Sequence, residues 1–332
     1  MASDTFKALV LEQHDGTVAA AVRDLDRSAL PDGEVLVRVA YSTLNYKDGL
    51  AITGRGPVVR DYPMVPGIDY VGTVEESASA AFAPGDQIIL TGWGVGERHW
   101  GGLAQLARAQ ADWLVKLPAG LSPQAAMGFG TAGLTAMLCL IALEEQGLQP
   151  GEREVIVTGA AGGVGSIAVA LLAGAGHNVT ASTGRTAAHD YLRGLGARQV
   201  VDREAVATPP ARPLARERWA GGIDTVGGET LASLLRSTAY TGAIAACGLA
   251  GGTTVNTTVL PFILRGVRVI GIDSVLASRA RREVAWARLA RDFPVAQLDS
   301  VTRMVPLGEV AGLADAIIDG QVRGRIIVDV NA

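Results

Sequence analysis

The sequence predicts an α/β protein in which a doubly wound parallel sheet domain is inserted into a β-rich domain. Three observations lead to this fold class. Residues 6–120 contain short apolar or alternating segments separated by turn residues. From Glu154 onward, apolar strand-like runs alternate with helical stretches, as in a parallel sheet. A last helix and strand are expected to return to the first domain, which gives domains of 1–126 with 276–332 and of 127–275.

The β-rich part opens with four predicted strands. A proline precedes the third, and a Pro-Gly-Asp turn precedes the fourth. These strands are Phe6–Glu12, Glu34–Tyr41, Gly67–Val74 and Gln87–Thr91. A further strand-like segment, Trp113–Pro118, leads to Ser122, which we expect to cap a helix that begins at Pro123.

The inserted domain begins with a long apolar segment. Met127–Leu143 is rich in Ala and Leu and predicts a buried helix with a break near Gly130–Gly133. The strands of the parallel sheet are predicted near 155–158, 178–182, 198–202, 222–226, 242–248 and 267–273. Thr208–Arg218 is rich in Pro and Arg and predicts a surface loop. Further predicted elements are an amphipathic helix at Ser278–Asp292, a helix at Leu307–Gly320 and a strand at Gly324–Val330.

Residues 155–185 have the pattern of a dinucleotide site. A short apolar strand, a glycine-rich turn, a helix of small residues and a second strand follow one another within roughly thirty residues. The spacing Ala160-x-Gly162-x-x-Gly165 is a variant of the dinucleotide fingerprint with alanine in the first place. Glycine lets the backbone approach a pyrophosphate closely, and the helix presents free N–H groups to its charge.

The end of the second strand favours NADPH as the cofactor. An NAD site usually has Asp or Glu there, about twenty residues on. Here the chain has Ser182, Thr183, Gly184 and Arg185, and the next carboxylate is that of Asp190. Hydroxyl groups and a guanidinium suit a 2′-phosphate, which a carboxylate would repel. The alternative interpretation is a glycine-rich turn with a solvated arginine.

Composition narrows the class of protein. The net charge of −4 provides no basic field for nucleic acid or an anionic membrane. Cys139 and Cys247 are too few for a disulfide framework or a four-cysteine zinc lobe, and we expect both to be buried and inert. The N-terminal segment lacks the signal-peptide pattern and the apolar runs end short of a membrane span, so we expect a cytoplasmic protein.

Six segments together carry a resemblance to a known family. They are LNYKDGLAITG at 44–54, YPMVPGIDYVGTV at 62–74, TGWGVGERHWGGLAQLARA at 91–109, GTAGLTAMLCL at 130–140, VTGAAGGVGS at 157–166 and PFILRGVRVIGIDSV at 261–275. With them, essentially the whole chain resembles the medium-chain dehydrogenase/reductase superfamily. Within it, the chain is similar to the zinc-independent quinone-oxidoreductase branch, of the bacterial acryloyl-CoA reductase type. The resemblance implies a Rossmann domain inserted in a GroES-like catalytic domain.

The zinc branch of this superfamily has ligands that this chain lacks. A zinc member would have a Cys near Asn45, His and Glu in place of Ile68 and Asp69, and a lobe of four cysteines. The histidines are scattered along the chain, at His14, His99, His177 and His189. A closed tetrahedral site cannot be built from this arrangement, so we expect no metal.

Reduction of an activated C=C bond is the activity that these features favour. With no metal to polarise a carbonyl, hydride addition at Cβ fits better than alcohol oxidation; charge then moves to the carbonyl oxygen and a proton arrives at Cα. The resemblance implies acryloyl-CoA, or a close short enoyl-CoA, as substrate. Two alternatives stay open: an NADPH:quinone or general enone reductase, and a protein that binds NADPH without turnover.

The resemblance also implies which residues lie near the nicotinamide and the substrate. Tyr46 either contacts the cofactor and donates a hydrogen bond or proton, or forms an aromatic wall. Asn45 either donates to a thioester oxygen or fixes the turn that follows it. Asp69 is expected to have a structural hydrogen-bonding role. Trp93 and Trp100 either roof the cleft or pack within their own loop.

Other family positions point to cofactor contacts. At the pyrophosphate these are Ala161, Gly162, Gly163 and Val164, and at the 2′-phosphate they are Thr183, Gly184 and Arg185. Arg203 is either a second phosphate partner or a solvated charge. Positions that line the nicotinamide half are Leu249, Ile263 and Ser274. At the end of the tail helix, where a polar contact such as Asn is expected, this chain has Asp319-Gly320-Gln321.

The expected partners are a CoA thioester and a second copy of the chain. Cations that border the cleft would bind the phosphates of CoA, although each is alternatively a solvated surface charge. These cations are Lys47, Arg55, Arg60, Arg98 and Arg323. Arg323 is counted with Asn45 and Tyr46 among the catalytic candidates. An extended strand around Val267–Asp273 is expected to pair across a two-fold axis and give a homodimer.

Overall fold

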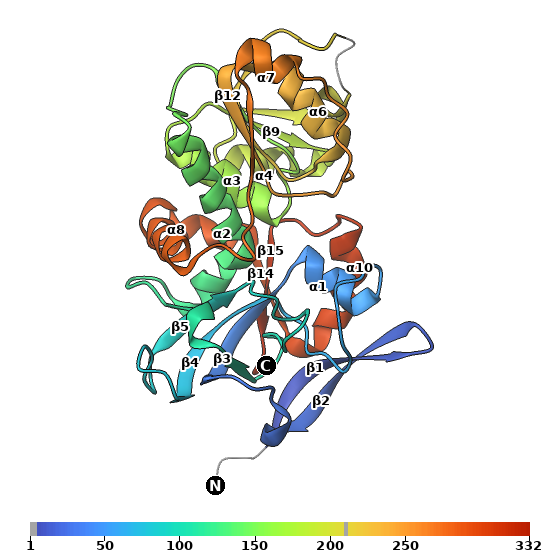
Figure 1. The fold of residues 1–332 in the computed structure, drawn as a ribbon, viewed down its shortest axis with the longest axis vertical. Coiled ribbons are helices and arrows are strands. Elements are labelled where there is room, and N and C mark those ends of the chain that lie inside the picture. The colour runs from blue at the N-terminus through green and yellow to red at the C-terminus, as the bar shows by residue number, and fades with distance from the viewer. Residues whose placement is uncertain (1–4, 209–211) are drawn as a thin grey trace. The chain divides into compact units, whose positions relative to one another are not determined.

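Two compact units make up the part of the chain that the computed structural model describes, residues 5–208 and 212–332 (Figure 1). The first unit runs to Thr131 and also holds Val275–Ala290 and Leu298–Ala332, and the second holds Ala132–Ser274 and Arg291–Gln297. The boundaries near 126 and 275 remain a prediction about domains. Residues 209–211 of the predicted loop Thr208–Arg218 lie outside the described residues.

An antiparallel ribbon begins the first unit. Its strands are β1 (Thr5–His14) and β2 (Thr17–Asp26), which pair along their whole length. Asp15 and Gly16 connect them with φ values of 49° and 79°, the left-handed conformation that suits Asp-Gly in a tight hairpin. Sequence reasoning predicted β1 and missed β2, because the residues of β2 are mostly exposed and show no buried face.

The main sheet of the first unit has seven strands in the order β14-β15-β3-β4-β5-β7, with β6 paired to β3. Their bounds are β3 (Val35–Leu44), β4 (Asp69–Ser77), β5 (Gln87–Thr91), β6 (Leu106–Ala109), β7 (Leu114–Lys116), β14 (Thr302–Pro306) and β15 (Arg325–Asp329). β15 pairs antiparallel with β3, with Ile326 opposite Leu44. The prediction that the tail returns to the N-terminal domain is therefore confirmed.

The first unit also contains helices (Figure 1). They are α1 (Tyr46–Thr53), α8 (Arg279–Asp292), α9 (Leu298–Val301) and α10 (Val310–Ile318), of which α8 ends in residues of the second unit. α1 packs on α10 through Gly49, where an added Cβ would lie 2.7 Å from the side chain of Ile317. Sequence reasoning missed α1, which is only two turns long.

Helix α2 (Pro123–Glu145) is broken by one glycine. The Ser122 hydroxyl accepts a hydrogen bond from the N–H of Ala125 (3.1 Å), so the predicted cap is confirmed. Gly130 has φ 50° and ψ −153°, which confirms the predicted break. Among the described residues, α2 is the one helix long and apolar enough to cross a membrane, but most of it is buried inside the protein, as in a core helix.

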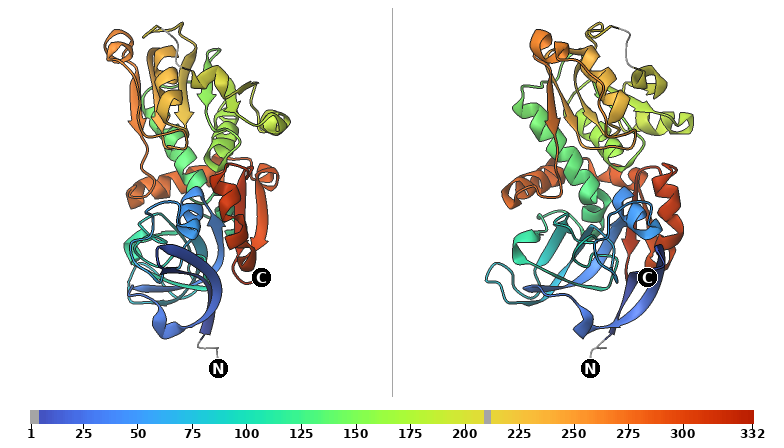
Figure 2. Two further views of the ribbon diagram at one scale, coloured as in Figure 1. Left: turned by 90° about the vertical axis from the view of Figure 1, so that its right-hand side faces the viewer. Right: turned by 45° about the vertical axis from the view of Figure 1, so that its right-hand side comes forward.

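A six-stranded parallel sheet forms the second unit, with helices on both faces (Figure 2). The strands are β8 (Glu154–Val157), β9 (Val179–Thr183), β10 (Gln199–Asp202), β11 (Trp219–Asp224), β12 (Thr238–Ala246) and β13 (Arg268–Gly271). The helices are α3 (Gly163–Gly174), α4 (His189–Gly194), α5 (Glu204–Ala207), α6 (Gly228–Ser237) and α7 (Leu260–Arg265). The order β10-β9-β8-β11-β12-β13 confirms the doubly wound Rossmann sheet.

Candidate active site

The glycine-rich turn lies at the carboxyl end of β8, where the strand order reverses between β8 and β11. Ligands of doubly wound sheets bind at this switch point. Gly159 adopts a φ of 57°, and a Cβ on Gly165 would collide with the carbonyl oxygen of Gly159. Gly165 therefore allows α3 to pack directly on the turn. The helix begins at Gly163 with Gly162 as N-cap and no side-chain cap, which leaves its first N–H groups for a phosphate.

Buried polar groups fix the neighbouring strand end. Asp224, at the end of β11, accepts hydrogen bonds from the Thr158 hydroxyl (2.5 Å) and the N–H of Gly227 (2.8 Å). The Thr225 hydroxyl donates to the carbonyl oxygen of Thr158 (2.9 Å). Burial raises the pKa of Asp224, and these hydrogen bonds oppose the shift. Sequence reasoning missed Asp224, although a carboxylate at the end of a buried strand was a signal for it.

Two guanidinium groups lie together beyond the carboxyl end of β9. The N–H of Arg203 donates to the carbonyl oxygen of Thr183 (3.0 Å), and the N–H of Arg185 donates to the Thr183 hydroxyl (3.2 Å). The guanidinium of Arg203 lies across Gly184, where a Cβ would strike it. Burial, and then the charge of Arg203, lowers the pKa of Arg185. Two adjacent cations make this strand end suited to a dianion such as a 2′-phosphate.

The remaining cofactor candidates of the second unit differ in their surroundings. The residues Ser182 and Thr183 are buried, and the carbonyl oxygen of Ser182 accepts from the N–H of Ala160 (3.0 Å). Leu249 and Ile263 are exposed apolar side chains. The Ser274 hydroxyl accepts from that of Thr135 (2.8 Å). Ala161, Gly162, Gly163 and Val164 form the turn and the start of α3.

A buried polar cluster in the first unit joins residues from β3, β4, β15 and α2. Asp69 accepts hydrogen bonds from the Thr43 hydroxyl (2.5 Å), the Thr131 N–H (2.7 Å) and the Asn45 amide (3.3 Å). Arg325 donates to the Asn45 carboxamide oxygen (2.8 Å) and to Thr43 (3.1 Å), and its guanidinium lies 3.9 Å from Asp69. Asp69 and Arg325 are 0% and 3% exposed, so the pair depends on these bonds to offset its desolvation.

Asp48 joins this cluster from the first turn of α1. It accepts hydrogen bonds from the N–H groups of Gly67 (3.1 Å), Ile68 (3.0 Å) and Asn45 (2.8 Å), and the last of these closes a capping box. Burial, and then the nearby carboxylate of Asp69, raises the pKa of Asp48 to about 7. The cluster thus holds two carboxylates close to one guanidinium, with the start of α1 attached to it.

Asn45 is engaged on both sides of its carboxamide. Its Nδ2 lies within hydrogen-bonding distance of Thr43, Asp48 and Asp69, and its Oδ1 accepts from Arg325. These contacts are those of a residue that fixes the following turn, the second of the two predicted roles. Sequence reasoning did not single out Arg325. Its signal was a charged residue inside the apolar strand pattern of 324–330.

Tyr46, by contrast, is the first residue of α1 and is 41% exposed. Two of the candidate cations, one at the start of α1 and one just after its end, are paired within the protein. Lys47 lies 2.9 Å from Glu97, and Arg55 lies 2.8 Å from Asp315. Arg55 also binds Asp319 at 2.9 Å, so an ion pair within the first unit occupies the position where the family resemblance suggested an Asn contact. The other candidate cations, Arg60, Arg98 and Arg323, have exposed side chains.

Trp100 and the thiols are placed in more ordinary surroundings. The Trp100 indole donates to the carbonyl oxygen of Pro63 (3.2 Å) and packs against two apolar clusters. Cys139 is fully buried, but Cys247 is only half-buried, because it follows the end of β12. The expectation that both thiols are buried is therefore wrong for Cys247. Throughout residues 5–208 and 212–332, no group of three His, Cys, Asp or Glu side chains could hold a metal ion.

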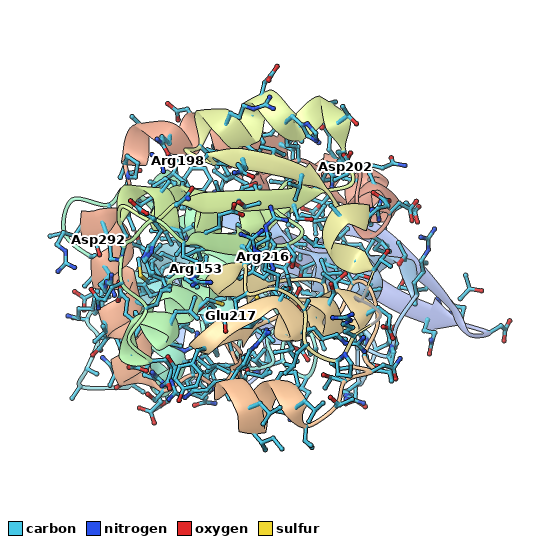
Figure 3. All side chains as sticks on the ribbon, turned by 90° about the horizontal axis from the view of Figure 1, so that it is seen from above. Arg153, Arg198, Asp202, Arg216, Glu217 and Asp292 are labelled. Carbon is cyan, nitrogen blue, oxygen red and sulfur yellow. The ribbon has the colours of Figure 1, made fainter. Side chains whose placement is uncertain are left out.

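A pocket of about 1060 Å³ in the second unit lies away from these groups. Its lining includes Glu154 and Trp219, the first residues of β8 and β11, together with Arg153, Arg216 and Glu217 (Figure 3). It therefore opens at the amino ends of the parallel strands, whereas the glycine turn lies at their carboxyl ends. Its arginines and glutamates are partly paired with one another, as in Arg153 with Glu217 at 3.7 Å.

Comparison with known proteins agrees with this architecture. The family model described as "Alcohol dehydrogenase GroES-like domain" matches residues 31–119, and that described as "Zinc-binding dehydrogenase" matches residues 163–291. An acrylyl-CoA reductase of Ruegeria pomeroyi is 53% identical over 98% of this chain and all of its own. A probable acrylyl-CoA reductase of Escherichia coli is 52% identical over the same shares.

A solved structure of the yhdH oxidoreductase from Salmonella enterica, in complex with NADP, is similar throughout. It is 53% identical, covers 98% of this chain and 99% of its own, and has a TM-score of 0.96. The chain belongs to the medium-chain dehydrogenase/reductase superfamily. Within it, the chain belongs to the quinone-oxidoreductase branch, with the acrylyl-CoA reductases.

Proposed function

We propose that this protein reduces the conjugated C=C bond of acryloyl-CoA, or of a closely related short enoyl-CoA, with NADPH. The pair Arg185 and Arg203 beside the uncapped start of α3 is the observation that carries the cofactor assignment. The substrate class rests on the two relatives that are named acrylyl-CoA reductases. An NADPH:quinone or general enone reductase is the weaker alternative, because both of these relatives carry the thioester name.

The residues of the second unit fit NADPH. Gly159 and Gly165 keep the turn free of Cβ atoms that would close it, and the first turn of α3 offers N–H donors to the pyrophosphate. Arg185 and Arg203 would hold the 2′-phosphate. Bound NADPH supplies the hydride that reduces Cβ of the substrate. The residues of the protein bind and orient the two reactants, which is the larger part of catalysis in such an enzyme.

In the first unit, Tyr46 is our candidate for the group that meets the substrate. Its ring is exposed at the start of α1, and the phenol can donate a hydrogen bond or a proton. Asn45 would position Tyr46 through the buried cluster, because its carboxamide is bound to Asp69 and Arg325. We assign Arg323 to the phosphates of CoA, since its exposed guanidinium precedes β15.

Parallel assays with acryloyl-CoA, crotonyl-CoA and a benzoquinone test this proposal. The fall in NADPH absorbance should be fast with the thioesters and slow with the quinone. Fast turnover with the quinone alone would refute thioester reduction. NADPH binding without turnover of any acceptor would instead favour a non-catalytic nucleotide-binding protein.

Tyr46→Phe should lower kcat with acryloyl-CoA more than it changes KM, because the phenol is expected to donate to the substrate. An unchanged kcat would show that Tyr46 has no part in the mechanism.

We also propose that the protein is a homodimer formed through the edge of the second unit's sheet. β13 is the last strand of the sheet, and exposed apolar side chains gather on it and on α7. They are Val259 (62%) just before α7, Ile263 (68%) and Leu264 (57%) on α7, and Val269 (42%) on β13. An open strand edge with apolar surface suits pairing across a two-fold axis.

Both cysteines are free thiols, which supports the reducing cytoplasm as the location of the protein.

Light scattering of eluting protein tests the dimer. Val269→Asp should convert a dimer of the wild type to a monomer, because it places a charge in the apolar edge. Val284→Asp is the matched control, since Val284 is 54% exposed on α8 in the first unit. A wild-type monomer, or a Val269→Asp variant that stays dimeric, would refute this interface.

A further inference from the structure

Trp93 has a backbone conformation that is unusual for a bulky residue. It follows β5 with a φ of 57°, between Gly92 and Gly94 with φ values of 74° and 81°. Glycine adopts this left-handed region freely, whereas a tryptophan is strained there. Strained residues persist only where their surroundings hold them, and they occur often at ligand sites. The loop therefore raises the question of what holds Trp93 and for what purpose.

Arg282 on α8 is the side chain that holds this loop. It is 1% exposed, and its Nη1 donates to the carbonyl oxygen (2.7 Å) and the hydroxyl (2.7 Å) of Thr91. Its Nη2 donates to the carbonyl oxygen of Val275 (2.7 Å), which also accepts from the N–H of Trp93 (3.0 Å). The guanidinium lies 4.9 Å from the centre of a Trp93 ring, a cation–π contact. Arg282 thus connects the Trp93 ring to Thr91 before it in the chain and to Val275, which lies before α8.

The sheet register brings Trp93 to the same end of the sheet as the substrate-binding candidate Tyr46. Thr91 pairs with Asp69 in the β4–β5 ladder, and the N–H of Gly92 donates to the carbonyl oxygen of Ile68 (2.9 Å). Asp69 is in turn bound to Asn45, the residue before Tyr46. Trp93 follows the end of β5 and Tyr46 follows the end of β3, and both of these strand ends lie beside the start of β4.

The Trp93 side chain also carries an unused hydrogen-bond donor. Its Nε1 is buried and has no hydrogen-bond partner among the residues that the structure describes. A buried N–H without a partner is costly, so it points to an acceptor that a ligand supplies. A carbonyl oxygen of a CoA thioester is an acceptor of this kind, and the flat ring beside it would form a rigid apolar wall.

We infer that Trp93 determines the acyl-chain length that the protein accepts, and that Arg282 is the positioning residue that holds its ring in place. The inference rests on the proposed reduction of a short enoyl-CoA. The ring would leave room for a three-carbon acyl group and exclude longer chains. A hydrophobic wall of this type discriminates by about tenfold or more for each additional methylene group.

Trp93→Gly is the sharpest test, because glycine removes the ring and also suits the left-handed backbone. Values of kcat/KM are measured with NADPH and acryloyl-, crotonyl- and hexenoyl-CoA. We expect the ratio of hexenoyl- to acryloyl-CoA to rise at least about tenfold over the wild type. Trp93→Phe, which keeps an aromatic wall, should retain most of the wild-type selectivity, and Trp100→Phe should retain all of it.

The role of Arg282 is tested through the same ratio. Arg282→Met should shift the chain-length profile in the direction of Trp93→Gly and should add no further shift in the double variant, because it acts through the ring. If Arg282→Met fails to fold, Trp93→Gly alone still decides the role of the ring. If the wild-type protein turns over acryloyl-CoA but the chain-length profile of Trp93→Gly is unchanged, the inference is refuted and the proposed function stands. No turnover of any thioester by the wild type refutes the proposed function as well.

Discussion

Replacing Arg185 by alanine should weaken NADPH binding by about tenfold and leave NADH binding nearly unchanged. A hydrogen bond to a charged group contributes about 1.5–3 kcal/mol, which corresponds to roughly 13- to 160-fold in affinity. We expect the lower end, for two reasons. Arg203 stays beside Gly184 and still meets the phosphate. Burial lowers the pKa of Arg185 most, and the charge of Arg203 lowers it further, so the two guanidinium groups repel each other. Removal of Arg185 relieves this repulsion in the free protein.

Titration calorimetry with NADPH and NADH on the same variants measures this difference. Arg198→Ala is a matched control, because Arg198 is an exposed guanidinium before β10, whereas Asp202 ends the strand next to Arg203 (Figure 3). The Arg185→Ala, Arg203→Ala double variant should lose most of the preference for NADPH. If Arg185→Ala weakens NADPH and NADH equally, Arg185 does not meet the 2′-phosphate and the reasoning from the strand end is wrong.

Three further predictions concern the two units separately. Gly165→Ala should abolish NADPH binding, measured by calorimetry, and lower the free energy of unfolding by about 1–3 kcal/mol, measured by urea unfolding. Gly194→Ala is the control, because an added Cβ there meets open space. Wild-type NADPH binding by Gly165→Ala would contradict the close packing of α3 on the turn. Burial, and then Asp69, raises the pKa of Asp48 from 3.8 to about 7, so folding takes up a proton between these values. The free energy of unfolding should therefore fall by roughly 2–3 kcal/mol from about pH 5 to 8, and an equal fall in Asp48→Asn would exclude this source. Arg325→Met leaves both carboxylates buried without their cation and should cost about 3–5 kcal/mol; an unchanged urea midpoint would show that the cation is dispensable.

Local patterns were sufficient for most of the fold. The six strands of the parallel sheet, the cap at Ser122 and the break at Gly130 each depend on a few neighbouring residues, and the structure confirms them. β2 and α1 were missed for local reasons too. β2 has no buried face to give an apolar alternation, and α1 is too short for a helical period to stand out.

The amino-acid sequence by itself determined the dinucleotide turn, because its glycines and the absence of a carboxylate after β9 are properties of one continuous segment. The buried cluster of the first unit was decided only by tertiary structure. Arg325 meets Asn45 across 280 residues because β15 pairs with β3. Its place inside an apolar strand pattern separates it from the exposed Arg323, but that pattern does not show which residues it meets. The hold of Arg282 on Trp93 has the same origin. Such contacts depend on which strands and helices become neighbours, and burial then makes each charge matter.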